Sequence, residues 1–184
     1  MRMYHYTSTA NWQRMNDDNP SENFLNPQTG RIVSGSAGRG LWPRRPLVPP
    51  PISGLPAEAY VAWSFGLEEE QPKKWTENSR FPNVWHNLLN YAAHGDGSLT
   101  LLEVTLLADD QPQVIDWAHI EQLPTHLALT VAEQHAYHRY WESRIALPCY
   151  DGSHDLPEII VQKPIPLERI KKAWDRRLSG KIVW

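Results

Sequence analysis

The sequence predicts one α+β domain spanning residues 1–184, and three observations lead to that fold class. Runs of apolar and β-branched residues predict strands, above all at 98–107 and 156–161. A capping signal at Thr130 opens a long helix between these two strands. Strands and helices follow one another without regular βαβ alternation, which favours a mixed or antiparallel sheet with flanking helices.

The first half of the chain predicts short elements around a long loop. Residues 2–7 alternate, so we expect a strand with His5 and Thr7 on one face and Tyr4 and Tyr6 on the other. The other expected elements are a short helix at 11–15, a functional loop over 19–56 that allows a short strand at Ile32–Val33, an aromatic strand at 59–65 and a helix over 79–92.

The second half predicts a more regular pattern. Residues 98–107 carry apolar side chains at both parities, which is typical of a central strand. After it we expect a strand at 113–116, a helical turn at 117–121, a helix from Thr130 to about Ile145, the strand at 156–161, a last helix from Pro166 with Ile170, Ala173, Trp174 and Leu178 on its inner face, and a final strand at 182–184.

Composition narrows the functional classes. The 184 residues match one domain, and 16 prolines beside 9 tryptophans indicate ordered loops. Cys149 is the single cysteine, so no internal disulfide can form and we expect a cytoplasmic protein. We expect neither a secretion signal nor a membrane span, because the start lacks an apolar region and no apolar run nears about 20 residues. A net charge of −3 gives no global electrostatic argument for nucleic acid binding.

Two residue groups allow metal or thiol chemistry but have simpler explanations. His135, His138 and Glu142 share a helix face and are residue types that bind Zn²⁺ or Fe²⁺. The zinc-helix pattern His-Glu-x-x-His is absent, and polar helix faces often collect such residues, so we expect no metal site. Cys149 could act as a nucleophile with His154 as its base, although a lone cysteine in a turn-rich loop is usually a packing residue.

Glu158 is the most unusual polar residue of the sequence. It stands at the mouth of the apolar run Leu156-Pro-Glu-Ile-Ile-Val161. A carboxylate in an interior strand needs a partner or a function. The alternatives are the solvent side of an edge strand, or a pair with a nearby arginine.

Both ends of the chain resemble one enzyme superfamily. The start Tyr4-His-Tyr-Thr-Ser8 is similar to the first strand of ADP-ribosyltransferases of the His-Tyr-Glu branch. The end, Pro157-Glu-Ile-Ile-Val-Gln-Lys-Pro-Ile-Pro-Leu-Glu-Arg-Ile170, resembles the tail of bacterial DNA-modifying ADP-ribosyltransferase toxins. The resemblance implies a split mixed or antiparallel sheet and NAD⁺ as the substrate.

The resemblance also implies roles for individual residues. Cleavage of the nicotinamide–ribose bond passes through an oxocarbenium-like ribose, which Glu158 would stabilise while accepting from the 2′-hydroxyl. His5, Tyr6 and Thr7 would bind NAD⁺, with His5 facing Glu158 across the sheet, and the catalytic residues would be Glu158, His5 and Arg45. Further expected contacts are Asn11, an aromatic that stacks on nicotinamide (Tyr60, otherwise Trp63 or Phe65), and one loop arginine (Arg45, otherwise Arg39 or Arg44).

The acceptor is less specified than the donor. Leu156 stands where arginine-specific transferases carry Glu or Gln, which argues against protein arginine as acceptor. We expect a toxin or defence enzyme that modifies nucleic acid, favoured, or protein, with an antitoxin partner allowed. The alternatives are NAD-dependent RNA 2′-phosphotransfer and a non-catalytic domain of the same fold that binds a nucleotide or a partner.

Overall fold

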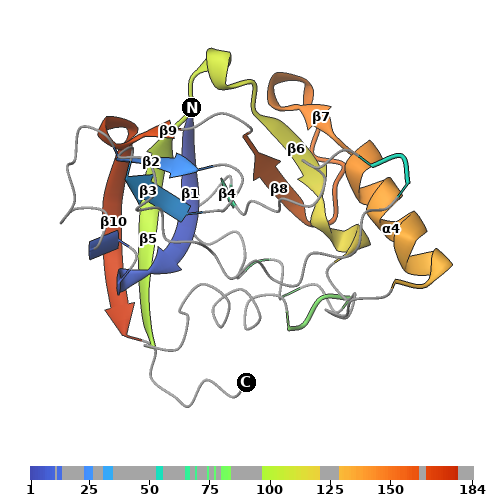
Figure 1. Ribbon diagram of the computed structural model, residues 1–184, viewed down its shortest axis with the longest axis horizontal. Helices are drawn as coiled ribbons and strands as arrows, with labels where there is room; N and C mark the ends of the chain where they lie inside the picture. The colour runs from blue at the N-terminus through green and yellow to red at the C-terminus, as the bar shows by residue number, and fades with distance from the viewer. Residues whose placement is uncertain are drawn as a thin grey trace.

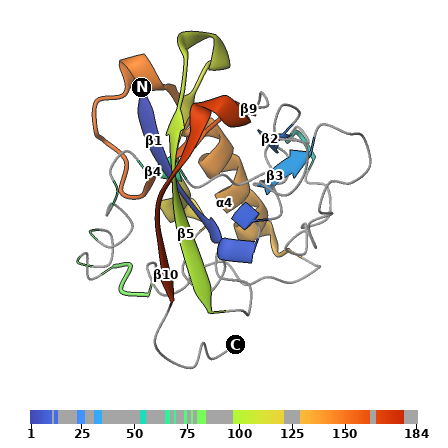
Figure 2. The same cartoon turned by 90° about the vertical axis from the view of Figure 1, so that its left-hand side faces the viewer.

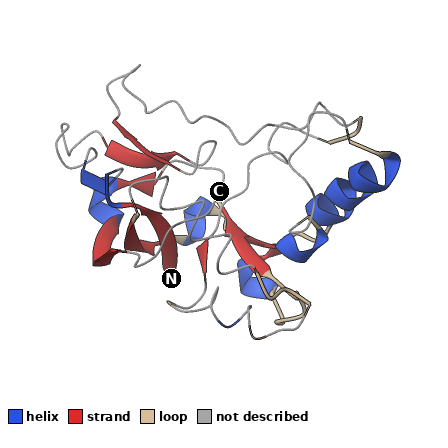
Figure 3. Cartoon of the chain, turned by 90° about the horizontal axis from the view of Figure 1, so that it is seen from below, coloured by secondary structure: helices blue, strands red, loops and turns tan. Residues whose placement is uncertain are grey.

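A computed structural model describes residues 1–10, 12–13, 23–26, 31–34, 53–55, 65–66, 69, 74, 77, 80–83, 97–120, 129–161 and 165–177. Over these ranges the protein has two antiparallel sheets and a helix, α4, at one end (Figures 1 and 3). This arrangement confirms the α+β class and antiparallel pairing.

The larger sheet has seven strands in the order β10-β5-β1-β4-β8-β6-β7. Its members are β1 (Arg2–Ser8), β4 (Phe65–Gly66), β5 (Ser98–Thr105), β6 (Gln113–Asp116), β7 (Ile145–Ala146), β8 (Pro157–Ile160) and β10 (Ile170–Arg177). Figure 2 shows β10, β5 and β1 side by side, with β5 between the other two. The strands expected near 2–7, 98–107, 113–116 and 156–161 are therefore confirmed.

A smaller sheet has three strands in the order β3-β2-β9. It consists of β2 (Asn23–Asn26), β3 (Arg31–Ser34) and β9 (Ile165–Pro166). The short strand expected at Ile32–Val33 is present in β3. The expectation that 19–56 is otherwise loop was wrong at β2. Strand β2 is held by pairing with β3 and β9, and its own four residues, two of them terminal asparagines, carry no clear strand pattern.

Helix α4 (Val131–Glu142) begins with the capping box that the sequence predicts. The Thr130 hydroxyl accepts from the Glu133 N–H at 3.3 Å, and the Glu133 carboxylate accepts from the Thr130 N–H at 2.7 Å. The helix lies beside β6 and the 3-10 turn η4 (Trp117–His119) (Figure 1). It directs Ala136 and Tyr140 into the protein interior.

The core is built mainly from the central strands. Its largest cluster combines apolar residues of β1, β5, β6 and β8 with Tyr140 of α4: Met3, Leu102, Val104, Val114, Ile115, Ile159 and Ile160. A second cluster on the other side of β1 and β5 contains Tyr6, Leu99 and Leu101. Both faces of β5 are thus buried, as its two apolar parities predict.

The final expected helix was wrong, because residues 170–177 form strand β10. The 3-10 turn η6 (Leu167–Arg169) precedes it. Ile170 pairs with Val104 and Trp174 with Leu101, and the register shifts between Lys172 and Trp174. This bulge places Ile170 and Trp174 on opposite faces of the strand. Apolar residues four positions apart in a bulged strand mimic a helical stripe, which explains the error.

Several expected elements lie mostly or wholly outside the described residues: most of the strand at 59–65, most of the helix over 79–92 and the strand at 182–184. Of the expected helix, residues 80–83 are described, and they are not helical. Helical backbone at 9–10 and 12–13 is described and overlaps the short helix expected at 11–15. Within the described ranges, no helix is both long and apolar enough to cross a membrane.

Candidate functional site

Glu158 lies on an interior strand and is almost completely buried. Strand β8 pairs with β4 on one side and with β6 on the other, where Glu158 faces Ile115. The residue is 1 % exposed. These observations exclude the solvent side of an edge strand, so the carboxylate requires compensating polar contacts.

Tyr140 of α4 provides one such contact. Its hydroxyl donates to the Glu158 carboxylate with an oxygen–oxygen distance of 3.0 Å, and the ring is 1 % exposed. Burial, followed by the nearby Glu158 charge, raises the pKa of Tyr140 well above 10.0. The phenol therefore keeps its proton and acts as a donor to the carboxylate. Helix α4 and strand β8 are joined through this contact.

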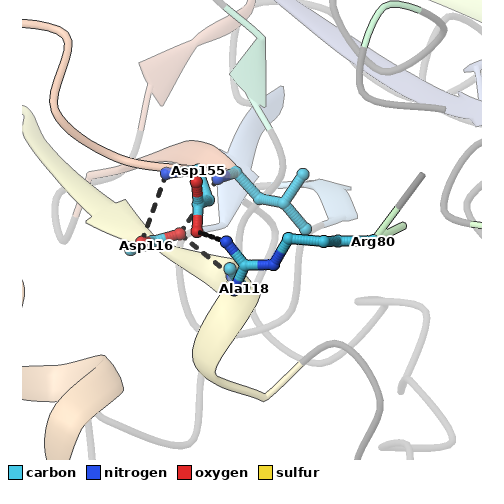
Figure 4. Close-up of polar contacts among 5 residues, drawn as sticks. Arg80, Asp116, Ala118 and Asp155 are labelled. Carbon is cyan, nitrogen blue, oxygen red and sulfur yellow. Dashed lines mark hydrogen bonds and ion pairs between the residues drawn. The ribbon is translucent and has the colours of Figure 1, made fainter. Parts of the chain in front are cut away.

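Asp116, at the end of β6, holds the entry to β8. Its carboxylate accepts from the backbone N–H groups of Ala118 at 3.1 Å, Leu156 at 3.0 Å and Asp155 at 3.3 Å (Figure 4). The N–H of Asp116 itself donates to Ser143 Oγ at 2.9 Å. Asp116 thereby fixes the backbone two residues before Glu158.

The loop before β8 carries further polar contacts. Arg80 Nη1 donates to Asp155 Oδ2 at 2.6 Å (Figure 4). The rings of Tyr150 and His154 lie 5.0 Å apart, and the Tyr150 hydroxyl accepts from the His154 N–H at 3.2 Å. Hydrogen bonds from Ser153 lower the pKa of Asp151. The loop is structured by its own side chains and by Arg80.

His5 and Thr7 lie on β1, two strands from Glu158. Both are buried, and β4 separates β1 from β8. His5 pairs with Phe65, and Phe65 pairs with Ile159. Because residues paired across a ladder point to the same face, His5 shares a face with Ile159, while Glu158 points to the other. The expectation that His5 faces Glu158 across the sheet therefore disagrees with the register.

Tyr6, expected to bind NAD⁺, lies in an apolar cluster on the opposite face of β1 from His5. Its ring meets Trp174 edge-on at 5.9 Å, and its hydroxyl donates to the Glu69 carbonyl. Trp174 Nε1 also donates to the Glu69 carboxylate, at 2.6 Å. These contacts give Tyr6 a packing role between β1 and β10.

Several other residues that the sequence suggests for the site lie outside the described part of the chain. Asn11, Tyr60, Trp63 and the loop arginines Arg39, Arg44 and Arg45 lie outside the described residues. Cys149 is exposed in a 3-10 turn. Among the described residues, no three His, Cys, Asp or Glu side chains are grouped to hold a metal ion, His135, His138 and Glu142 included.

Sequence reasoning missed two residues that support Glu158. Tyr140 lies four residues after Ala136 on the inner stripe of α4, so its burial is readable, but its pairing with Glu158 depends on how the helix packs. Asp116 directly precedes a helical turn, which is an N-cap signal. Its contacts to residues 155–156 are visible only in the fold.

Comparisons with protein families, with curated proteins and with solved structures find no match to this chain.

Proposed function

We propose that the protein is an NAD⁺-dependent ADP-ribosyltransferase in which Glu158 stabilises the ribosyl cation. The observation that carries the proposal is the buried Glu158 carboxylate, held by Tyr140 on an interior strand. A carboxylate that the fold keeps inside an apolar cluster, with a donor in place, is preorganised to stabilise positive charge.

The order of strands gives additional support. Strands β1 and β8, which carry His5 and Glu158, are both neighbours of β4 in the sheet, and β4 contains Phe65, one of the alternatives for the stacking aromatic. His5 and Thr7 point to the face opposite Glu158, so the sheet would separate them from a ribose held at Glu158, and the proposal for Glu158 does not depend on them. Because Glu158 is 1 % exposed, the proposal requires that groups covering it move when NAD⁺ enters.

The reaction follows from these roles. The bond between C1′ of the ribose and the nicotinamide nitrogen breaks, and the electron pair leaves with nicotinamide. The Glu158 carboxylate offsets the positive charge that develops on the ribose and accepts from its 2′-hydroxyl. A nucleophilic atom of the acceptor then bonds to C1′ and loses its proton to solvent. We propose a toxin or defence role, with nucleic acid favoured over protein as the acceptor.

Label transfer tests the activity and the acceptor together. NAD⁺ labelled on the adenylate phosphate is incubated with the protein and separate pools of DNA, RNA and protein. We expect nicotinamide release and label on a nucleic acid pool, both lost in Glu158→Ala. Label on the protein pool would instead identify protein as the acceptor. Release of no nicotinamide by the folded wild-type protein, with any pool, would contradict the proposal.

A further inference from the structure

A cavity of about 480 Å³ lies beside the N-terminal half of α4. Its walls come from this helix, from the turn η4 and from residues 80–81. The volume falls within the range of about 300–1,000 Å³ typical of small-molecule sites. Its lining residues are Arg80, Phe81, Ala118, His119, Ala132, Glu133, Ala136 and Arg139.

The lining combines apolar residues with cationic side chains from different elements. Phe81 and Ala136 are each 4 % exposed and are apolar members of the lining. Arg80 comes from the segment before Phe81, and Arg139 comes from α4. Guanidinium groups bind phosphate through paired N–H donors, and the apolar part of the lining suits a flat ring. The cavity therefore has the chemistry of a site for a phosphate-bearing aromatic ligand.

Both acidic groups near the cavity accept hydrogen bonds, Glu133 from Thr130 and Asp155 from Arg80, so Arg80 is itself part of an ion pair. The Glu133 carboxylate accepts from the Thr130 N–H at 2.7 Å and from the Thr130 hydroxyl at 2.8 Å, at the positive end of the helix dipole. Asp155 is bonded to Arg80, whose guanidinium lies 5.2 Å from the Phe81 ring centroid. Among the described residues, the ion pairs do not include Arg139.

The cavity lies next to residues that contact or position Glu158. Ala132, Ala136 and Tyr140 are spaced by four residues and so follow one face of α4, where Tyr140 bonds Glu158 one turn beyond the cavity. Asp155, which holds Arg80, lies three residues before Glu158 (Figure 4). A ligand anchored in the cavity would contact α4, which carries Tyr140, and Arg80, which is bonded to Asp155.

We propose that this cavity binds the phosphate group of a nucleotide through Arg80 and Arg139. The identity of the ligand as a nucleotide rests on the proposed function, whereas its anionic character rests on the cavity. Two sources share this chemistry: the pyrophosphate of NAD⁺ and the backbone of a nucleic acid acceptor. Either ligand would bind on the side of β8 that faces α4.

Calorimetric titration tests the site and separates the two sources. The wild-type protein, Arg139→Gln and the Arg80→Gln/Arg139→Gln double variant are each titrated with NAD⁺ and with a short single-stranded oligonucleotide at low salt. The control is Arg144→Gln, because the Arg144 guanidinium lies over Trp141 at 3.5 Å, away from the cavity lining. We expect at least one ligand to bind Arg139→Gln about tenfold more weakly than wild type, with the control unchanged.

The outcomes separate this inference from the proposed function. The ligand that loses affinity identifies the source of the phosphate. Wild-type affinity of both ligands for the double variant, or no binding of either ligand to the folded wild-type protein, overturns the inference. Nicotinamide release is measured on the same preparations. Ligand binding that depends on the arginines, without nicotinamide release, contradicts only the enzyme proposal. Nicotinamide release without arginine-dependent binding contradicts only the cavity inference.

Discussion

Glu158 presents an energetic problem that Tyr140 helps to solve. Burying a carboxylate costs several kcal/mol unless hydrogen bonds replace its hydration. The 3.0 Å bond from the Tyr140 hydroxyl offsets part of this cost, inside a cluster whose other members include Ile159 and Ile160. The pair links the stability of the fold to the residue that we propose carries the chemistry.

Removal of the Tyr140 hydroxyl should destabilise the protein without creating a large cavity. Tyr140→Phe keeps the ring and deletes one donor to a buried carboxylate, so we expect the free energy of unfolding to fall by about 1–3 kcal/mol. Urea denaturation measures the change. Tyr4→Phe is the control, because it removes the hydroxyl of a half-buried tyrosine on β1. Equal stability of Tyr140→Phe and wild type would contradict the importance of this bond.

The raised pKa of Tyr140 also predicts a loss of stability at alkaline pH. Above the ordinary pKa of 10.0, the unfolded chain releases a proton that the folded protein retains. Below pH 10 the contribution is intact; above it, the free energy of unfolding falls with a slope of up to about 1.4 kcal/mol per pH unit for one proton.

The variants separate Tyr140 from other groups that titrate in this range. Burial also raises the pKa of Tyr150, so Tyr140→Phe should reduce the alkaline slope of the unfolding free energy, not abolish it. Urea unfolding of wild type, Tyr140→Phe and Tyr150→Phe between pH 9 and 11 gives the slopes. An unchanged slope in Tyr140→Phe would be inconsistent with the assignment.

At the scale of elements, local signals predict strands and helices where they agree with tertiary pairing. The capping box at Thr130 and the two apolar parities of 98–105 act locally, and both α4 and β5 are confirmed. The prediction for residues 170–177 was wrong because the bulge between Lys172 and Trp174 reverses the alternation of side chains between the two faces of strand β10. A bulge is set by the partner strand β5, so residues 170–177 read in isolation do not contain it.

Asp116 predicts a measurable coupling between β6 and the start of β8. Asp116→Ala removes the acceptor of three backbone N–H groups, at Ala118, Asp155 and Leu156. We expect a loss of about 3 kcal/mol, measured by urea unfolding, because buried donors are left unpaired. Asp116→Asn retains one acceptor oxygen and should lose less. The same large loss in both variants would show that the charge, not the acceptor geometry, stabilises this junction.

At the scale of the whole molecule, the sheet brings the two ends of the sequence close together. Strand β1 is separated from β8 only by β4, although 148 residues (9–156) separate the two strands in the chain. The sequence predicts β1, β8 and the unusual Glu158, because each depends on local composition. It does not predict which face each residue occupies relative to another strand, since that depends on register. His5 and Glu158 illustrate the difference.

The central claim is that Glu158 stabilises a ribosyl cation, and steady-state nicotinamide release tests it most directly. Rates are compared for the wild type, for Glu158→Gln and for Glu142→Gln, an exposed control on α4. Circular dichroism and thermal unfolding establish that each variant is folded. We predict release by the wild type, an equal rate in Glu142→Gln and a rate about 100-fold or more lower in Glu158→Gln. A folded Glu158→Gln variant that releases nicotinamide at the wild-type rate would contradict the account.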